Sequence, residues 1–229
     1  MSRSNKSNSN QIGRVLSRVL VIAGSDSGGG AGIQGDIKTI TCLGGYAATV
    51  ITALTAQNTL GVFAIHNVPE DFIAQQIKLV LDDIGADVLK TGMLNKESVI
   101  IAVADTISKY PHIPLVLDPV MFAKGGAALL EQTALATLKS RLIPLATIIT
   151  PNIPEAQTLI SNLSNKQELA QAILESGCKA VLLKGGHETG PYSDDLLLDN
   201  QGNATILSSK RILSKNTHGT GCTLSAAIA

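Results

Sequence analysis

The chain ends on NTHGTGCTLSAAIA, in which a glycine-rich segment stands directly before small residues with helical character. The segment consists of Gly219, Thr220, Gly221 and Cys222. Its backbone N–H groups would lie at a helix start, where the helix dipole is positive and unpaired donors point outward, so they could bind an anion. Phosphoryl transfer depends most on such donors, because charge spreads over the transferred group in the transition state. Taken alone, the stretch would be assigned to a glycine-rich turn followed by a small buried cysteine.

Two side chains extend the phosphoryl-transfer interpretation. Cys222 would face the acceptor hydroxyl, and a thiol near a helix N-terminus has its thiolate favoured, so it would act as a base or orient the substrate. Lys184, in VLLKGGHETG, ends an expected strand before two glycines. Its ammonium can meet a phosphate there while the flexible backbone admits a nucleotide. The Gly-Lys-Ser/Thr order of a Walker A loop is absent.

Oxygen-bearing side chains follow two neighbouring strands. Asp118 lies in DPVM, and Asn152 and Glu155 lie in TPNIPEA. Mg²⁺ prefers oxygen ligands of this kind and usually keeps several waters besides. A structural interpretation makes Asn152 a helix N-cap and Glu155 its capping-box partner behind Pro154. Both roles can coexist.

A second glycine-rich segment, GSDSGGGAGIQGD at residues 24–36, follows the first expected strand. Gly30, Gly32 and Gly35 spell the GxGxxG of a dinucleotide site, but no Asp or Glu occurs between residues 37 and 69 to hold a ribose hydroxyl. We therefore interpret it as a flexible loop that lets backbone approach a small ligand, with Asp26 and Asp36 at its edges. An ordinary turn, with Asp36 exposed on the helix, is the alternative.

Residues after the intermediate strands suit a flat heterocycle. Gln57 and Asn58 end an apolar strand, and their amides offer both donors and acceptors to a ring. Met93 in KTGML and Val120 in DPVM supply soft apolar walls. Taken singly, the amides could equally bond local backbone and the apolar residues could belong to the core.

The elements that must position these residues alternate along the chain. Short apolar runs predict strands at residues 19–23, 48–53, 88–90, 115–118, 147–150 and 180–184. Helical spacing predicts helices at residues 32–43, 70–83, 96–109, 131–142, 154–161 and 166–176. Residues 62–68 and a hairpin of residues 195–199 and 204–208 read as extra strands. We expect an α/β fold, a doubly wound, mostly parallel sheet that binds its ligand beyond the strands' carboxyl ends.

Composition limits the classes of partner. Hydrophobic residues make up 45% of the 229 residues, and the 18 basic and 18 acidic residues cancel, so nucleic acid and anionic membranes are disfavoured. Three widely spaced cysteines suggest neither a disulfide framework nor a zinc site and fit a reducing compartment. Residues 1–18 are basic and rich in Ser and Asn, which favours a disordered tail over a targeting peptide.

Seven motifs in order carry a family resemblance: GSDSGGGAGIQGD, TALTAQNT, KTGML, VLDPVM, TPNIPEA, LLKGGH and NTHGTGCTLSAAIA. From about Val19 to its last residue the chain closely resembles the hydroxymethylpyrimidine/phosphomethylpyrimidine kinases, the thiamine-pathway branch of the ribokinase-like superfamily. The resemblance implies a three-layer ribokinase-like domain over residues 19–229. It also implies ATP- and Mg²⁺-dependent phosphorylation of 4-amino-5-hydroxymethyl-2-methylpyrimidine to its monophosphate and then to the diphosphate.

The resemblance also implies roles for matching residues. The pyrimidine pocket should involve Gly24, Asp36, Gln57, Met93 and Val120. The ATP phosphates should meet Lys184 and Thr220, and the magnesium side should involve Asp118 and Glu155. The anion hole and acceptor end should be formed by Gly219, Gly221 and Cys222. The wider superfamily usually has Asp as the base at this last position, so a general-base role for Cys222 is less secure than its place in the site.

The chain departs from the family pattern in two ways. Gly35 stands where Ala is common, and Gly125-Gly126 replace a commoner Ser-Gly, but neither change removes a chemical group. Family members continue for a few dozen residues past GTGC, so the C-terminal end looks truncated, and we expect these 229 residues to be weakly active or unstable alone. A homodimer in the cytoplasm is expected.

Two other functions remain open. A vitamin B6 kinase has the same fold and phosphorylates a hydroxymethyl group on a pyridine. A pyrimidine-binding module without catalysis is an alternative from a different class, and would bind the ring without ATP-dependent turnover. The intact phosphate-side residues, Lys184 and residues 219–222, favour a kinase.

Overall fold

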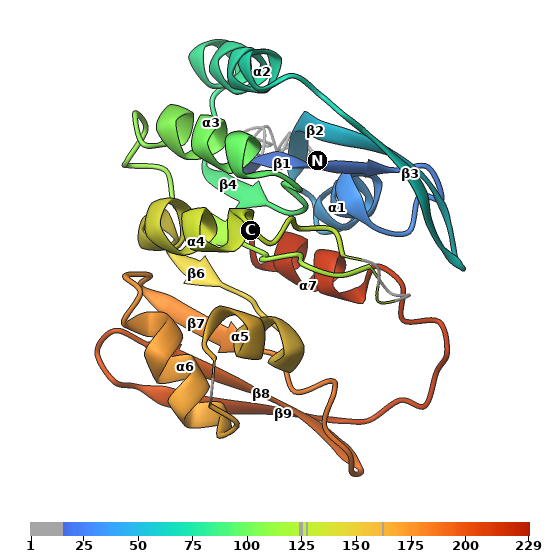
Figure 1. Ribbon diagram of the computed structural model, residues 1–229, viewed down its shortest axis with the longest axis vertical. Coiled ribbons are helices and arrows are strands. Elements are labelled where there is room, and N and C mark those ends of the chain that lie inside the picture. The colour runs from blue at the N-terminus through green and yellow to red at the C-terminus, as the bar shows by residue number, and fades with distance from the viewer. Residues whose placement is uncertain (1–15, 124–125, 127, 162) are drawn as a thin grey trace, which may run out of the picture.

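The computed structural model describes residues 16–123, 126, 128–161 and 163–229, and within them the chain forms one nine-stranded sheet (Figure 1). The spatial order is β3-β2-β1-β4-β5-β6-β7-β8-β9. The strands are β1 (Arg18–Asp26), β2 (Tyr46–Asn58), β3 (Gly61–Asn67), β4 (Val88–Thr91), β5 (Leu115–Leu117), β6 (Ile148–Ile149), β7 (Ala180–Leu183), β8 (Tyr192–Asp199) and β9 (Ala204–Lys210). The run from β2 to β7 is parallel, whereas β3 at one edge and β8 and β9 at the other are antiparallel.

Helices cover both faces of the sheet. They are α1 (Gly32–Cys42), α2 (Glu70–Asp83), α3 (Glu97–Ile107), α4 (Ala134–Thr137), α5 (Ile153–Leu159), α6 (Lys166–Leu174) and α7 (Thr220–Ile228). The larger apolar core lies between one sheet face and α2 to α6, and a smaller core joins Val19 and Val21 of β1 to α1 and α7 through Ile40 and Ala226. This three-layer, doubly wound arrangement is the predicted one. Strand β1 is buried along nearly its whole length, as expected for a parallel strand with helices on both faces of its sheet.

One expected helix is wrong. Instead of a single helix over residues 131–142, α4 covers Ala134–Thr137 and continues as a π-helical turn at Leu138–Leu142 and a 3₁₀ turn at Ile143–Leu145. The wide turn lets Leu138, Leu142 and Ile143 all face the core, each at most 3% exposed, and Pro144 prevents a regular continuation. The other expected helices, the extra strand at residues 62–68 and the hairpin are confirmed within a few residues, as α1, α2, α3, α5, α6, β3 and β8–β9.

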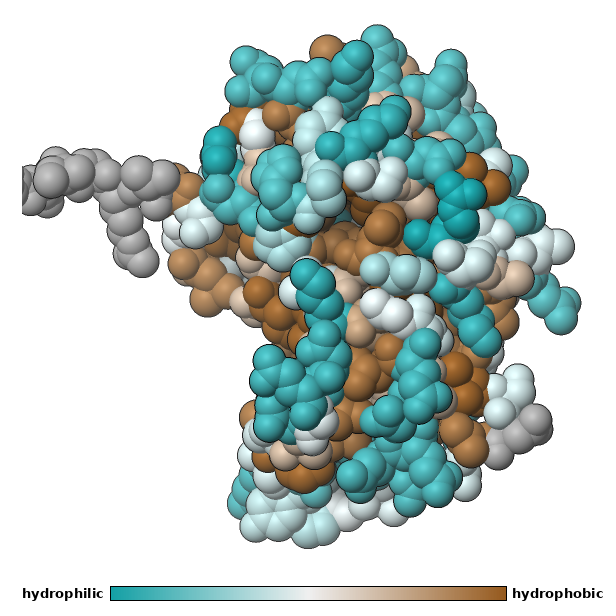
Figure 2. All heavy atoms as spheres, turned by 90° about the vertical axis from the view of Figure 1, so that its left-hand side faces the viewer, coloured by the Kyte–Doolittle hydropathy of each residue, from teal (hydrophilic) through white to brown (hydrophobic). Residues whose placement is uncertain are grey.

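The two ends of the strands differ. The arrowheads of β1, β4 and β6 point to the right of Figure 1, so the carboxyl ends of the parallel strands lie there. Figure 2 shows the opposite side, where apolar side chains gather in the narrow middle of the view between two mainly hydrophilic parts. The expected tail of residues 1–18 lies outside the described residues except for its last three, of which Arg18 begins β1. None of the helices in the described residues has the length and apolar character to cross a membrane.

Candidate active site

The carboxyl ends of the parallel strands open into a cleft of about 750 Å³. All but one of the residues proposed from the sequence line it: Gly24, Gln57, Met93, Asp118, Val120, Glu155, Lys184, Gly219, Thr220, Gly221 and Cys222. These residues come from β1, β2, α7 and the segments that follow β4, β5, β6 and β7. The sheet therefore brings together residues that are up to 198 positions apart, from Gly24 to Cys222.

Asp36 is the residue that does not line the cleft. Its side chain is fully buried under α1, where Oδ2 accepts a hydrogen bond from Lys90 Nζ at 2.8 Å. The expected contact with a pyrimidine and the alternative of an exposed helical position are both incompatible with this placement. Asp36 lies one turn into α1 and faces the sheet, where β4 presents the lysine.

Lys90 is a cleft residue that the sequence reasoning missed. It lines the cleft although its side chain is 0% exposed. Burial alone would lower the pKa of Lys90, but the carboxylates of Asp36 and Asp118 around it raise that pKa, so the ammonium stays charged. The sequence does carry a sign of this lysine, since Lys90 ends the apolar strand expected at residues 88–90. A lysine within a buried strand needs a buried partner of opposite charge.

The apolar end of the cleft is formed by Met93 and Val120. Met93 is 8% exposed and belongs to a small core cluster with Ala53 and Leu129, against which Val120 packs. A Cβ on Gly24 would lie 3.3 Å from Met93 Sδ, so the backbone of the first glycine-rich segment is in contact with this wall. The sulfur, the branched side chain and the bare backbone leave a surface suited to a flat ring.

A second part of the cleft is formed by the start of α7. Gly219 is the N-cap residue with φ of 82°, a left-handed conformation that disfavours side chains. Lys184 lies against this helix start, because a Cβ on Gly221 would be 3.4 Å from its Nζ. An ammonium and the first N–H groups of a helix thus converge on one point, which is the arrangement that binds phosphate.

The environment of Cys222 contradicts the expectation that its thiolate is favoured. Burial raises the pKa of the thiol to about 11, although the nearby Lys90 acts to lower it. The thiolate is therefore disfavoured at neutral pH, and desolvation outweighs the influence of the helix N-terminus. Cys222 lines the cleft as expected, but as a neutral thiol.

Asp118 and Glu155 lie on the same wall of the cleft. Asp118 Oδ1 accepts hydrogen bonds from Lys184 Nζ and Thr150 Oγ1, both at 3.3 Å, and its Oδ2 accepts from Ser225 Oγ of α7 at 3.1 Å. The expected capping box is confirmed, since Asn152 Oδ1 accepts from the Glu155 N–H and Glu155 Oε2 from the Asn152 N–H, each at 2.9 Å. Burial raises the pKa of Glu155 to about 7, against the lowering effect of Lys184.

This pair of carboxylates fits one mode of magnesium binding. No three Asp, Glu, His or Cys side chains among the described residues converge as a complete protein cage for a metal ion. Mg²⁺ commonly takes one or two carboxylates together with waters and phosphate oxygens. Asp118 and Glu155 beside Lys184 would supply the protein part of such a set.

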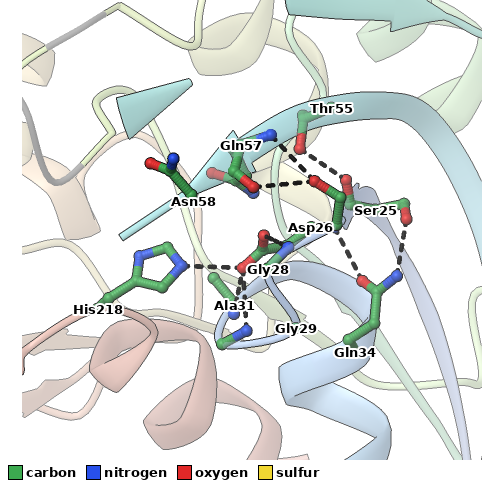
Figure 3. Close-up of polar contacts among 12 residues, drawn as sticks. Ser25, Asp26, Gly28, Gly29, Ala31, Gln34, Thr55, Gln57, Asn58 and His218 are labelled. Atoms are coloured by element: carbon green, nitrogen blue, oxygen red, sulfur yellow. Dashed lines mark hydrogen bonds and ion pairs between the residues drawn. The ribbon is translucent and has the colours of Figure 1, made fainter. Parts of the chain in front are cut away.

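Figure 3 shows the first glycine-rich loop, where Asp26 lies against His218 of the C-terminal glycine-rich segment. His218 Nε2 is 2.8 Å from Asp26 Oδ2, a pairing across 192 residues that the sequence reasoning missed. Nearby, Ser27 Oγ donates to the Gln57 carbonyl at 2.9 Å and accepts from the Gln57 N–H at 3.0 Å. Gln57 is thus held by its backbone. Within the described residues its side-chain amide makes no hydrogen bond to the protein, so it can bind a ligand.

Comparison with known families decides the relationship. Residues 26–229 match the family described as phosphomethylpyrimidine kinase. The chain belongs to this family. It is 47% identical to the hydroxymethylpyrimidine/phosphomethylpyrimidine kinase of Escherichia coli, covering 92% of this chain and 80% of that protein. It is 53% identical to the thiamine biosynthesis bifunctional protein ThiED of Geobacter sulfurreducens, over 92% of this chain and 44% of that protein.

Solved structures agree with the family assignment. The phosphomethylpyrimidine kinase of Clostridium difficile superimposes with a TM-score of 0.80 at 42% identity, over 93% of this chain and 88% of that one. A pyridoxal kinase of Bacillus subtilis in complex with ADP gives 0.84 at 36% identity, over 93% and 82%. The phosphomethylpyrimidine kinase family fold is therefore shared with enzymes that act on a second ring alcohol, pyridoxal.

Proposed function

We propose that this chain transfers phosphate from ATP to 4-amino-5-hydroxymethyl-2-methylpyrimidine, and then to the resulting monophosphate, as a step of thiamine diphosphate biosynthesis. The observation that carries the proposal is the single cleft with two chemically different ends. An apolar wall with a free amide lies at one end, and an ammonium beside a helix start lies at the other.

The pyrimidine ring would bind at the apolar end. Met93 and Val120 would contact its faces, and the Gln57 amide would pair with the ring nitrogens and exocyclic amine, since an amide donates and accepts. The backbone of Gly24 allows a close approach of the ring. Asp36 contributes indirectly, by holding Lys90 at the cleft floor.

The nucleotide phosphates would bind at the other end. Lys184 and the N–H groups of residues 219–222, including that of Thr220, would hold the outermost phosphate. Burial alone would lower the pKa of Lys184, but Asp118 and Glu155 raise it, so the side chain stays an ammonium. Mg²⁺, held by Asp118 and Glu155 with phosphate oxygens, would neutralise phosphate charge.

The reaction is an in-line displacement. The substrate hydroxymethyl oxygen forms a bond to the γ-phosphorus as the bond to the ADP oxygen breaks, and the hydroxyl proton leaves to solvent or to a phosphate oxygen. The loose transition state needs little help from a base. With a thiol pKa of about 11, Cys222 suits orientation of the acceptor better than proton removal. The Gly219 and Gly221 backbone keeps the charge-stabilising N–H groups close.

The likeness to pyridoxal kinases gives a second candidate substrate. Pyridoxal also carries a hydroxymethyl group on a flat ring but lacks the exocyclic amine. A site built around the Gln57 amide should discriminate against it. We further propose that residues 19–229 act as one kinase unit, and that the enzyme is a cytoplasmic homodimer.

The test is incubation of the purified chain with ATP, Mg²⁺ and the aminopyrimidine, followed by mass spectrometry of the products. Monophosphate followed by diphosphate, with one ADP for each transfer, is the expected result. The ratio of kcat/KM values should favour the aminopyrimidine over pyridoxal. Ring binding by calorimetry without any phosphorylated product would instead support a non-catalytic binding module.

A further inference from the structure

Two glycine-rich segments from opposite ends of the chain are packed directly on each other. A Cβ on Gly219 would lie 1.8 Å from the carbonyl oxygen of Gly30, and a Cβ on Gly30 would lie 2.6 Å from His218 Cδ2. Only glycine fits at either position without displacing the other segment. The loop that precedes α1 and the helix start that faces the nucleotide therefore share one interface.

Asp26 is the polar centre of this interface. Its carboxylate is 1% exposed, and Oδ1 accepts a hydrogen bond from the Gly28 N–H at 2.7 Å. Its Oδ2 accepts from the N–H groups of Gly30 and Ala31 at 3.0 and 2.8 Å. His218 Nε2 completes the set at 2.8 Å (Figure 3). Three bonds go to one glycine-rich loop and the fourth to the other.

The charge state of Asp26 fixes the direction of the fourth bond. Burial acts to raise the pKa of Asp26, but the bonds from His218, Ala31 and Gly28 together hold it below the usual value. The ionised carboxylate only accepts, so His218 Nε2 carries the hydrogen. A buried carboxylate with several N–H donors is a rigid anchor, because removing one partner leaves desolvated charge behind.

The anchor is also connected to the proposed pyrimidine end. Asp26 ends β1, where its N–H donates to Gln34 Oε1 at 2.8 Å. The adjacent Ser27 holds the backbone of Gln57. Asp26 itself does not line the cleft, whereas His218, Gln57 and residues 219–222 do. Asp26 thus lies behind the site, with contacts that lead to both of its ends.

We propose that Asp26 and His218 are a positioning pair that sets the phosphate-binding N–H groups of residues 219–222 relative to the pyrimidine end of the cleft. This inference rests on the proposed kinase function. The pair acts through the placement of the α7 start, since Asp26 does not line the cleft and its bond to His218 ties the two glycine-rich segments together. Misplacement of aligned groups by about 1 Å can reduce turnover about a hundredfold, so the effect should appear in kcat.

The first test replaces His218. His218→Ala should lower kcat about 10- to 100-fold with a much smaller change in KM for the pyrimidine. His218→Gln, whose side-chain N–H can still donate to Asp26, should restore most of the lost kcat. His112→Ala is the matched control, because His112 is exposed in the turn before β5, and it should leave kcat unchanged. All assays are run at a temperature where circular dichroism shows each variant folded.

The second test is a double-mutant cycle. If the two residues act as one unit, Asp26→Asn combined with His218→Ala should lower kcat about as much as the worse single variant. Losses that multiply would overturn the proposal, because they would mean independent roles. Failure of His218→Gln to recover kcat, or equal losses in kcat and in folded fraction, would likewise overturn it and leave a structural role only.

The outcome is separable from that of the proposed function. The unmodified chain is assayed first, and its failure to phosphorylate the pyrimidine would contradict the function itself. Activity in the unmodified chain with wild-type kcat in His218→Ala would contradict the positioning pair alone. Gly30→Ala gives an independent steric check, since its methyl group would displace the imidazole while both side chains of the pair remain, and it should lower kcat as His218→Ala does.

Discussion

Two lysine–aspartate pairs, each with its lysine lining the same cleft, differ in how far their side chains are exposed to solvent. Lys90 Nζ is 2.8 Å from Asp36 Oδ2, and both side chains are 0% exposed. Lys184 Nζ is 3.3 Å from Asp118 Oδ1, with side-chain exposures of 13% and 3%. The first pair joins β4 to α1 beneath the cleft, and the second lies at its mouth beside the start of α7.

The difference indicates separate tasks for two chemically identical pairs. The Lys90–Asp36 pair is sealed from solvent, and Asp36 Oδ1 is buried without a hydrogen-bond partner in the described part of the chain, so neither side chain can exchange its partner for water. Lys184 makes a longer bond and is partly exposed, so its ammonium can turn toward a phosphate while Asp118 receives a cation.

The largest effect is expected on stability at the sealed pair. Asp36→Ala should lower the free energy of unfolding by about 3–5 kcal/mol, because it leaves a buried ammonium without its partner. Urea denaturation followed by circular dichroism measures this change. The double variant Asp36→Leu with Lys90→Met should recover much of the loss, since an apolar pair removes the uncompensated charge. A loss below about 1 kcal/mol, typical of exposed pairs, would contradict the sealed environment.

At the open pair the effect should fall on activity instead. Lys184→Met should reduce kcat/KM for ATP about 10²- to 10³-fold, the range for removing a donor that stabilises transition-state charge. Its free energy of unfolding should change far less than that of Asp36→Ala. Lys179→Met, at the far end of β7 and exposed, is the matched control for steady-state assays. A Lys184 variant as unstable as the Asp36 variant would erase the distinction between the pairs.

Cys222 lies near both lysines and should show a smaller effect. Because the thiol pKa is raised to about 11, Cys222→Ala removes at most one neutral contact and should lower kcat about tenfold or less, with a smaller change in KM. Cys42→Ala, on the exposed end of α1, is the control. Iodoacetamide labelling should be slow at Cys222 near pH 8 and accelerate toward pH 11. A kcat loss above a hundredfold would restore the base role.

An exposed third pair gives the smallest expected effect. Arg18 bonds Asp87 at 2.8 Å at the other end of the sheet, with side chains 42% and 45% exposed. The hydrogen bonds and charge of Arg18 lower the pKa of Asp87 from 3.8 to about 2, so its stabilisation is present above pH 4 and is lost as pH falls toward 2. Arg18→Gln should leave kcat unchanged and should shift the melting temperature slightly at pH 7 and less at pH 2. A large shift at pH 7 would contradict the weakness of exposed pairs.

Local patterns predicted more of the fold than of the charge network. The capping box of Asn152 and Glu155 could be read from four residues, and the helix at Glu70–Asp83 from its spacing and start. The Asp36–Lys90 and Asp26–His218 pairs join residues 54 and 192 positions apart, so no local pattern identifies either partner. The prediction that the Cys222 thiolate is favoured was wrong for a related reason. Burial by segments distant in the sequence raises the thiol pKa more than the local helix terminus lowers it.

The central claim is that one cleft holds both the pyrimidine alcohol and the outer phosphate of ATP. A crystal structure of the chain with the aminopyrimidine and a non-hydrolysable ATP analogue tests it most directly. The account predicts the terminal phosphate at Lys184 and the N–H groups of residues 219–222, with the ring between Gln57 and Met93 and its hydroxymethyl oxygen facing the phosphorus. Either ligand bound outside this cleft, with the cleft itself empty, would contradict the claim.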